Sequence, residues 1–367
     1  MDDIKKRDDI INTLKQEIED EEFPPSSNIY NSWVRGEYEL SSDDDSTPYP
    51  TKQCRFFDKH GFILIPNFAS TDEVQSMKCT MEQIVNDEWH PSKHESTEVF
   101  RTDDKQCDAQ GKSDYFLDSA DKVHFFAETS AIIEESGELK EEYKSNKLTA
   151  LNKVGHGIHT RSGAFKDYTS NKVSKLLRDL GWKAPVVPQS MYIFKQALIG
   201  GEVTSHQDST FLYTTPKQSC IGLWLALDEA TLENGCLWVR PGSHKESVRR
   251  QFVRNPEHFG KSLTGDGEDG DSTQPQMIFR KLNDDQDITW EGGLPTDLYE
   301  AGFIPVPVKA GSLLAFNGEL DHLSLPNTSS NARHTFQLHC IEGEEEGVTW
   351  SNENWLQYPS GTSFMKL

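Results

Sequence analysis

The C-terminal half of the chain has the hydrophobic pattern of an antiparallel β-sandwich or barrel. From Pro185 onward, short apolar runs are separated by turn residues. Runs of this length and spacing are typical of strands in such folds. The apolar runs are Met191–Leu198, Cys220–Leu227, Cys236–Val239 and Ser312–Phe316. We therefore predict that this half forms a β domain.

Two turns and an edge strand are predicted within this region. Asn234-Gly235 lies between two apolar runs and predicts a two-residue hairpin, because both residues tolerate the positive φ of a type I′ turn. Pro241-Gly242 predicts a type II turn. In 304–309 the apolar residues alternate with prolines, which suits an edge strand that leaves one side without hydrogen bonds.

Helical patterns come earlier in the chain. Residues 61–66 predict a short buried strand that ends at a proline. Ser70 and Glu73 then have the spacing of a capping box, and apolar residues recur at three- and four-residue steps up to Trp89. A second helix is predicted over Asn171–Leu180, closed by Gly181. We expect these helices to flank the β domain.

The acidic residues are concentrated in two segments. The net charge is -23, and residues 1–50 carry 14 acidic and 5 basic side chains, while residues 256–300 carry 11 and 3. We therefore expect a flexible acidic arm over 1–50 and a domain over 51–367 that contains an acidic, Gly- and Asp-rich insertion or lid at about 255–300. The overall acidity argues against nucleic acid or an anionic membrane as a partner.

The cysteines and the N-terminal residues predict a soluble, cytoplasmic protein. The six cysteines form no CxxC pair, so neither a zinc ribbon nor a disulfide framework is indicated. The first residues lack the apolar segment of a signal peptide, and no run is long enough to span a membrane. A small-molecule substrate is the expected partner, and the oligomeric state stays open.

His206 and Asp208 are the first candidate metal ligands. In an extended chain, residues i and i+2 point to the same side, so these two side chains could bind one ion together. One further histidine would complete a facial triad, which leaves three adjacent positions on Fe(II) open. An H-x-D pattern alone is weak, because chance occurrences are common.

A second group of residues raises the significance of this pattern. His322 follows the apolar run 312–316, and Arg333 comes eleven residues later. The guanidinium fork of an arginine near a metal can pair with the distal carboxylate of a dicarboxylate co-substrate whose keto acid end binds the iron. Twelve histidines are present. We interpret His244 as structural, and we expect His156 and His159 to lie before the barrel, at the surface or behind the ligands.

These segments resemble the phytanoyl-CoA dioxygenase (PhyH) family, and within it the group of phytanoyl-CoA dioxygenase domain-containing protein 1. The segments that occur in the family order are His206-Gln207-Asp208-Ser209-Thr210, Glu233-Asn234-Gly235-Cys236-Leu237, Pro241-Gly242-Ser243-His244, Lys309-Ala310-Gly311-Ser312, residues 317–324 and Arg333. Residues 112–117 and 354–357 also resemble that group, and the resemblance spans roughly Phe56 to Gln357.

The resemblance implies a fold, an activity and a set of site residues. The fold is mainly β with flanking helices, a double-stranded β-helix or jelly roll with N-terminal helices packed on one sheet. The activity is an Fe(II)- and 2-oxoglutarate-dependent oxygenase that uses O2, hydroxylates a small-molecule or acyl substrate, and converts 2-oxoglutarate to succinate and CO2. The implied residues are His206, Asp208 and His322 as iron ligands, Arg333 as the partner of the 2-oxoglutarate carboxylate, and Lys153, Met191, Trp224 and Ser324 in the co-substrate pocket.

Two alternatives differ from this interpretation in the reaction that they imply. A halogenase of the same architecture needs a metal position for halide, usually obtained by loss of the carboxylate ligand, and Asp208 is present. A catalytically silent 2-oxoglutarate sensor or recruitment protein on the same fold stays open. No cluster of basic residues in the sequence marks a site for acyl-CoA phosphates.

Overall fold

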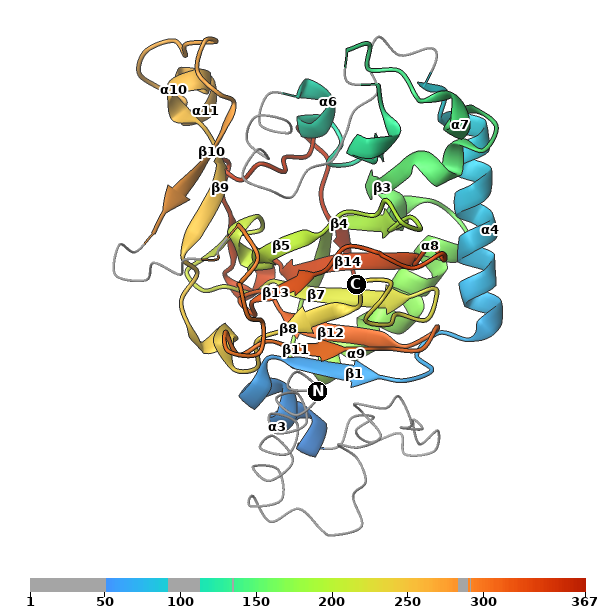
Figure 1. The fold of residues 1–367 in the computed structure, drawn as a ribbon. Coiled ribbons are helices and arrows are strands. Elements are labelled where there is room, and N and C mark those ends of the chain that lie inside the picture. The colour runs from blue at the N-terminus through green and yellow to red at the C-terminus, as the bar shows by residue number, and fades with distance from the viewer. Residues whose placement is uncertain (1–50, 92–112, 134, 283–289, 291) are drawn as a thin grey trace.

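Two antiparallel sheets face each other and form the body of the protein (Figure 1). A computed structural model describes residues 51–91, 113–133, 135–282, 290 and 292–367. The predicted acidic arm lies outside the described residues, and so does a part of the predicted insertion. The architecture is the double-stranded β-helix, or jelly roll, that the sequence predicted, mainly β with flanking helices.

The larger sheet has eight strands. Its order is β1 (Phe62–Ile65), β12 (Leu313–Asn317), β7 (Ile221–Ala226), β14 (Thr335–Glu342), β4 (Pro185–Ile193), β3 (Leu151–His156) and β2 (Val123–Ala127), and the short β16 (Met365–Lys366) also pairs with β4. Strands far apart in sequence are thus neighbours. The smaller sheet has the order β11 (Ile304–Val306), β8 (Leu237–Val239), β13 (His322–Ser324) and β5 (Val203–His206). The predicted edge strand, β11, is confirmed at the end of this sheet.

Helices pack against the outer face of the larger sheet. They are α3 (Thr51–His60), α4 (Thr71–Glu88), α8 (Ala164–Tyr168), the π-helical turn η6 (Thr169–Val173) and α9 (Ser174–Asp179). The predicted capping box begins α4, where Ser70 Oγ accepts from the Glu73 amide and Glu73 accepts from the Ser70 amide. The ring of Phe165 on α8 lies 4.9 Å from that of Phe336 on β14. The expectation that N-terminal helices cover one sheet is confirmed.

The other face of the larger sheet points toward the smaller sheet. In β14, Phe336 and Leu338 alternate with Gln337 and His339. Because neighbouring residues of a strand point to opposite faces, Gln337 and His339 lie on the inner face. Cross-strand register places Trp224 and Met191 beside Gln337 on that face. The inner face is therefore the polar and aromatic wall of the barrel interior.

Short helices and two-stranded pairings complete the described chain. The short helices are α6 (Asp114–Leu117), η3 (Thr129–Ala131), α7 (Glu141–Lys144), η4 (Lys147–Ala150), η5 (Ile158–Thr160), η7 (Asp208–Thr210), η8 (Ser243–Lys245), α10 (Pro256–Phe259), α11 (Lys261–Thr264) and η9 (Glu344–Glu346). The additional pairs are β9 (Arg250–Arg254) with β10 (Met277–Lys281), and β6 (Thr214–Thr215) with β15 (Thr349–Trp350). None of the helices in the described part of the chain combines the length and the apolar character needed to cross a membrane.

The predicted hairpin at Asn234-Gly235 is wrong. The flanking strands β7 and β8 belong to different sheets. Only Gly235 has a positive φ, 81°, so the type I′ geometry is not formed. Instead the Asn234 side chain accepts a hydrogen bond from the Thr231 amide at 2.7 Å and stabilises a turn that carries the chain between the sheets. The predicted type II turn is confirmed, because Gly242 has φ 83° and ψ -11°.

Two further expectations are corrected. The sequence predicts a strand over Met191–Leu198, but β4 covers 185–193 and the chain turns away after Ile193. His156 and His159 do not precede the barrel and are not at the surface, while their alternative place behind the ligands stays a prediction. His156 ends β3, which is part of the larger sheet, and both histidines are buried. The β2–β3 pair was missed because its residues are less regularly apolar than the later strands.

The predicted insertion follows β9 directly and contributes β10 to a projecting hairpin, β9–β10 (Figure 1). Its connection contains α10 and α11. Beyond the hairpin, the chain returns to the smaller sheet, where Gly292 and Gly293 exchange backbone hydrogen bonds with Ser205 on β5 at 3.0 and 2.9 Å. Gly292 and Gly293 thus lie beside the strand that ends at His206. Whether it acts as a lid stays a prediction.

Candidate metal centre

Two side chains of the smaller sheet and one of the turn that follows β5 converge on one point. His206 ends β5, Asp208 begins the turn η7 directly after it, and His322 begins β13, which pairs with β5 so that His206 and His322 are opposite each other. One ligand atom from each residue lies within 4.8 Å of the other two. The Asp208 Oδ1 atom is 3.5 Å from His206 Nε2 and 3.6 Å from His322 Nε2. The sequence expectation that these residues meet agrees with this geometry.

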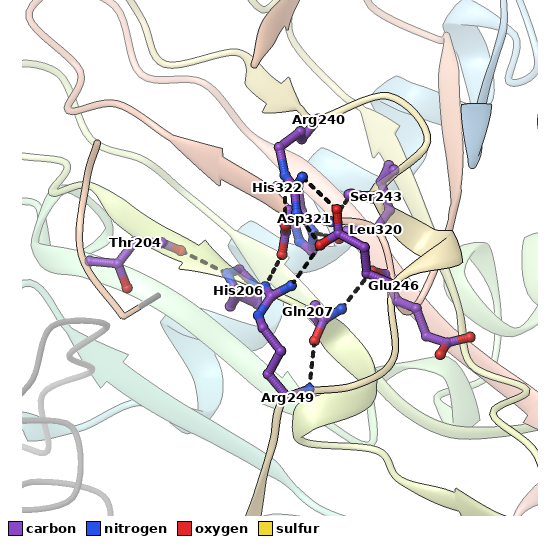
Figure 2. A network of polar contacts seen from close by, with 11 residues as sticks. Thr204, His206, Gln207, Arg240, Ser243, Glu246, Arg249, Leu320, Asp321 and His322 are labelled. Carbon is purple, nitrogen blue, oxygen red and sulfur yellow. Dashed lines mark hydrogen bonds and ion pairs between the residues drawn. The ribbon is translucent and has the colours of Figure 1, made fainter. Parts of the chain in front are cut away.

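Backbone carbonyls orient both imidazoles. His206 Nδ1 donates to the Thr204 carbonyl at 2.8 Å, and His322 Nδ1 donates to the Leu320 carbonyl at 3.0 Å (Figure 2). A histidine that donates from Nδ1 leaves the lone pair of Nε2 free, which is the arrangement found for metal ligands. Both Nε2 atoms face Asp208. The donor set of two imidazoles and one carboxylate suits Fe(II) and leaves three coordination positions open.

A third histidine holds the carboxylate of Asp208. His339 Nε2 donates to Asp208 Oδ2 at 2.9 Å, and His339 Nδ1 accepts from the Gln189 side chain at 2.9 Å. One carboxylate oxygen is thus fixed by the larger sheet, while the other faces the two imidazoles. Gly222 makes room for this contact, because a Cβ atom there would lie 2.8 Å from Asp208 Oδ2.

The protonation states of Asp208 and His322 suit metal binding, whereas His206 must lose a proton below its raised pKa. Burial would raise the pKa of Asp208, but His339, His322 and His206 together hold it well below its usual range. Burial and the neighbouring His206 lower the pKa of His322 to about 4, so this imidazole is neutral at physiological pH. Burial lowers the pKa of His206, but the hydrogen bond and the charge of Asp208 outweigh burial and raise it. A carboxylate and neutral imidazoles are the forms that bind metal ions.

Arg333 is a buried cation on the inner side of the barrel. Its side chain is 2% exposed, and its Cζ atom lies 5.0 Å from the centre of the Trp224 ring. Its Nε and Nη1 atoms have no hydrogen-bond partner among the residues that the structure describes. A buried guanidinium is costly unless it is paired, so these donors fit an anion that the protein chain does not supply. Burial lowers its pKa to about 10, which leaves it charged.

The other predicted pocket residues lie on the same interior side with different partners. Met191 is beside Gln337 on the inner face, and Lys153 Nζ lies 3.8 Å from Met191 Sδ and 3.0 Å from His156 Nε2. Burial lowers the pKa of Lys153 well below its usual value. The Ser324 hydroxyl donates to the Gly235 carbonyl and accepts from Lys195 Nζ at 2.8 Å.

Several residues around the centre were missed by the sequence interpretation. His339, Gln189 and Lys195 are buried polar residues on or beside the sheets. The alternation of polar and apolar residues over 335–340 was a signal that could have identified His339. No such signal marks Lys195. His244, which was interpreted as structural, contacts the backbone carbonyl of Asp58 at 2.8 Å.

Comparison with known sequences identifies the family. The model of the family described as phytanoyl-CoA dioxygenase (PhyH) matches residues 57–335. A phytanoyl-CoA dioxygenase of Arabidopsis thaliana is 39% identical over 307 residues, which are 83% of this chain and 92% of the relative. Phytanoyl-CoA dioxygenase domain-containing protein 1 of Mus musculus is 39% identical over 306 residues, which are 83% of this chain and 94% of the relative.

Solved structures share the fold at low sequence identity. The epimerase SnoN, crystallised with Fe3+, alpha-ketoglutarate and nogalamycin RO, has a TM-score of 0.50 and 12% identity, with 85% of this chain and 90% of that chain covered. The non-heme alpha-ketoglutarate-dependent carbocyclase SnoK has a TM-score of 0.50 and 15% identity, with 87% and 96% covered. From the family match and the donor set of the site, the chain belongs to the phytanoyl-CoA dioxygenase (PhyH) family and is a 2-oxoglutarate-dependent non-haem iron dioxygenase.

Proposed function

We propose that the protein hydroxylates a small-molecule or acyl substrate at this centre. The observation that carries the proposal is the combination of the three converging ligand atoms with the buried, unpaired donors of Arg333. The first fits one metal ion, and the second fits the distal carboxylate of 2-oxoglutarate. An Fe(II) centre with 2-oxoglutarate and O2 supplies the oxidation, in which one oxygen atom enters a substrate C–H bond and the other enters succinate as CO2 is released.

The residues of the chain have separate tasks in this proposal. His206, Asp208 and His322 hold the Fe(II) ion. Arg333 binds the distal carboxylate of 2-oxoglutarate through its planar fork. His339 keeps the Asp208 carboxylate turned so that only Oδ1 faces the metal position. An Fe(II) ion held by these three residues would have room for 2-oxoglutarate and O2.

Four more residues form the walls of the co-substrate site in this proposal. Trp224 packs against the Arg333 guanidinium and limits its positions. Met191 and Lys153 lie next to each other on the inner side of the larger sheet. Ser324, held by Lys195, stands two residues after His322. Trp224, Lys153 and Ser324 are buried, and their burial excludes water from the site, which strengthens each electrostatic contact made there.

The substrate approaches from the side of the β9–β10 hairpin in our proposal. The Phe211 ring lies 5.9 Å from the ring of His206, and it also contacts Phe252 on β9 and Phe279 on β10 at 5.6 and 6.1 Å. The Arg250 guanidinium lies 4.0 Å from the centre of the Phe279 ring. Aromatic side chains beside a metal position favour a substrate with an apolar portion next to the reacting carbon.

The test is a search for an oxygenated product. The protein with Fe(II) and 2-oxoglutarate is incubated under 18O2 with a fractionated small-molecule extract, and an Asp208→Ala variant is the control. We expect one product that gains a single 18O atom, with one succinate formed for each, in the wild type alone. Tight 2-oxoglutarate binding without any succinate over hours would refute the hydroxylase and favour a silent sensor.

A further inference from the structure

A buried ion-pair network lies directly behind the metal centre. Asp321, the residue before His322, is 0% exposed. Its Oδ2 atom accepts hydrogen bonds from Nε and Nη2 of Arg240, and its Oδ1 atom accepts one from Nη2 of Arg249 (Figure 2). Glu246 accepts from Nη1 and Nη2 of Arg240 at 2.7 and 2.5 Å, and it lies 3.5 Å from Arg249 Nη1. The proposed catalytic residues do not include any of these four.

The backbone of Asp321 is held as firmly as its side chain. Its amide donates to the Ser243 hydroxyl at 2.9 Å, and its carbonyl accepts from the Arg240 amide at 2.9 Å. Ser243 and Arg240 belong to the turn around Pro241-Gly242 that the sequence singled out. Both backbone polar groups of Asp321, the residue directly before His322, are therefore hydrogen-bonded. These bonds fix the start of the segment that carries the ligand.

The same network reaches the other two ligands through Gln207. Gln207 stands between His206 and Asp208 and is 0% exposed. Its Oε1 atom accepts from the Arg249 amide at 3.2 Å, and its Nε2 atom donates to the Glu319 carbonyl at 2.9 Å. The side chain thus joins the His206–Asp208 segment to the His322 segment. Arg249 is bound both to Gln207 and to Asp321.

Arg249 also lies at the root of the β9–β10 hairpin. The next residue, Arg250, begins β9, and the Arg249 carbonyl accepts from the Leu282 amide, just after β10, at 2.9 Å. The side chains of Arg250 and Phe279 in this hairpin are those that we place near the substrate. One buried cluster therefore connects both metal-ligand segments to the substrate side.

We infer that Asp321 is a positioning residue that, through Arg240 and Arg249, sets the place of His322 relative to His206 and Asp208. The inference rests on the proposed function, because it takes these three residues as the metal ligands. A buried carboxylate held between the buried guanidinium of Arg249 and the partly buried guanidinium of Arg240 is rigid, since displacement would leave charges unpaired. Outer residues that fix ligand orientation typically change metal affinity 10- to 100-fold when they are replaced.

The probe for the test is Co(II), whose visible absorption reports coordination geometry. The apoprotein is titrated with Co(II) in the wild type, Asp321→Asn and a Val85→Ala control. Val85 is 0% exposed in α4 and takes no part in the network, so its truncation destabilises the fold without touching the centre. We expect Asp321→Asn to raise the Co(II) Kd at least tenfold and to change the absorption spectrum. Val85→Ala should leave both unchanged.

Three further variants test the network, replace Asp321→Asn if it does not fold, and test the metal ligands separately. Glu246→Gln changes only the half-exposed member of the network and should have a smaller effect than Asp321→Asn. If Asp321→Asn does not fold, Arg240→Lys, which keeps a cation but loses the fork, replaces it and should raise the Kd several-fold. A wild-type Kd and spectrum in the folded variant would overturn the inference. His322→Ala separates the two claims, because Co(II) binding that survives in it refutes the triad itself.

Discussion

Replacement of Arg333 by methionine should weaken 2-oxoglutarate binding and at the same time stabilise the protein without ligand. Methionine keeps most of the apolar contact with Trp224 but removes the charge. Loss of one partner from a desolvated charge pair costs about 2 to 5 kcal/mol. This corresponds to a rise of roughly thirty- to several-thousand-fold in the Kd for 2-oxoglutarate.

The Arg333→Met variant should lose affinity for 2-oxoglutarate but gain stability without ligand, because the buried charge is removed. Burial lowers the pKa of Arg333 from 12.5 to about 10, so the folded protein carries the charge at a cost that the unfolded chain does not have. The difference corresponds to up to about 3 kcal/mol at neutral pH. The ligand-free Arg333→Met variant should therefore melt at a higher temperature than the wild type. A purely structural arginine would give the opposite result.

The assay is a titration of Fe(II)-loaded protein with 2-oxoglutarate, followed by the metal-to-ligand absorption band, together with thermal denaturation of the ligand-free protein. Arg333→Lys should recover only part of the affinity, because an ammonium group lacks the bidentate fork. Arg161→Met is the control, since Arg161 pairs with Glu88 in a half-exposed ion pair. Equal 2-oxoglutarate affinities in the wild type and both Arg333 variants would refute the reasoning and assign the carboxylate to another cation, such as Lys195 or Lys153.

Three more predictions concern the metal. Gly222→Ala should lower metal affinity at least tenfold in a Co(II) titration, because the added Cβ would lie 2.8 Å from Asp208 Oδ2 and 2.5 Å from the Phe316 ring. Unchanged affinity would contradict this prediction. His339→Leu should weaken Co(II) about 10- to 100-fold by releasing Asp208 Oδ2, and wild-type affinity would show that the carboxylate needs no such support. Metal affinity should fall about tenfold per pH unit below the raised pKa of His206, because a proton must leave the imidazole before the ion binds. A metal affinity that stays constant over pH 5 to 8 would contradict this prediction.

The sequence predicted those parts of the fold that follow from local patterns. The capping box at Ser70, the type II turn at Gly242 and the edge strand β11 depend on neighbouring residues, and the structure contains all three. The predicted hairpin at Asn234-Gly235 is wrong, because it also required the two flanking apolar runs to pair with each other. Their actual partners are distant in sequence, and each lies in its own sheet. A local turn signal cannot reveal which sheet a strand joins.

The same limit applies to the site. His206, Asp208, His322 and Arg333 could be proposed as site residues because ligand spacing and family resemblance mark them. The residues that hold them could not, since Asp321 and His339 act through partners that are far away along the chain. Arg249 and Asp321 are 72 residues apart, and His339 and Asp208 are 131 apart. Only the pairing of the strands brings such groups together.

Iron stoichiometry after dialysis tests the central claim most directly. The wild type and His322→Ala are loaded with Fe(II) without oxygen and dialysed, and the iron per chain is measured, with circular dichroism to confirm folding. We predict one iron per wild-type chain and almost none in His322→Ala, because two remaining ligands bind too weakly to survive dialysis. Full iron stoichiometry in a folded His322→Ala variant would contradict the assignment of His206, Asp208 and His322 as the metal centre.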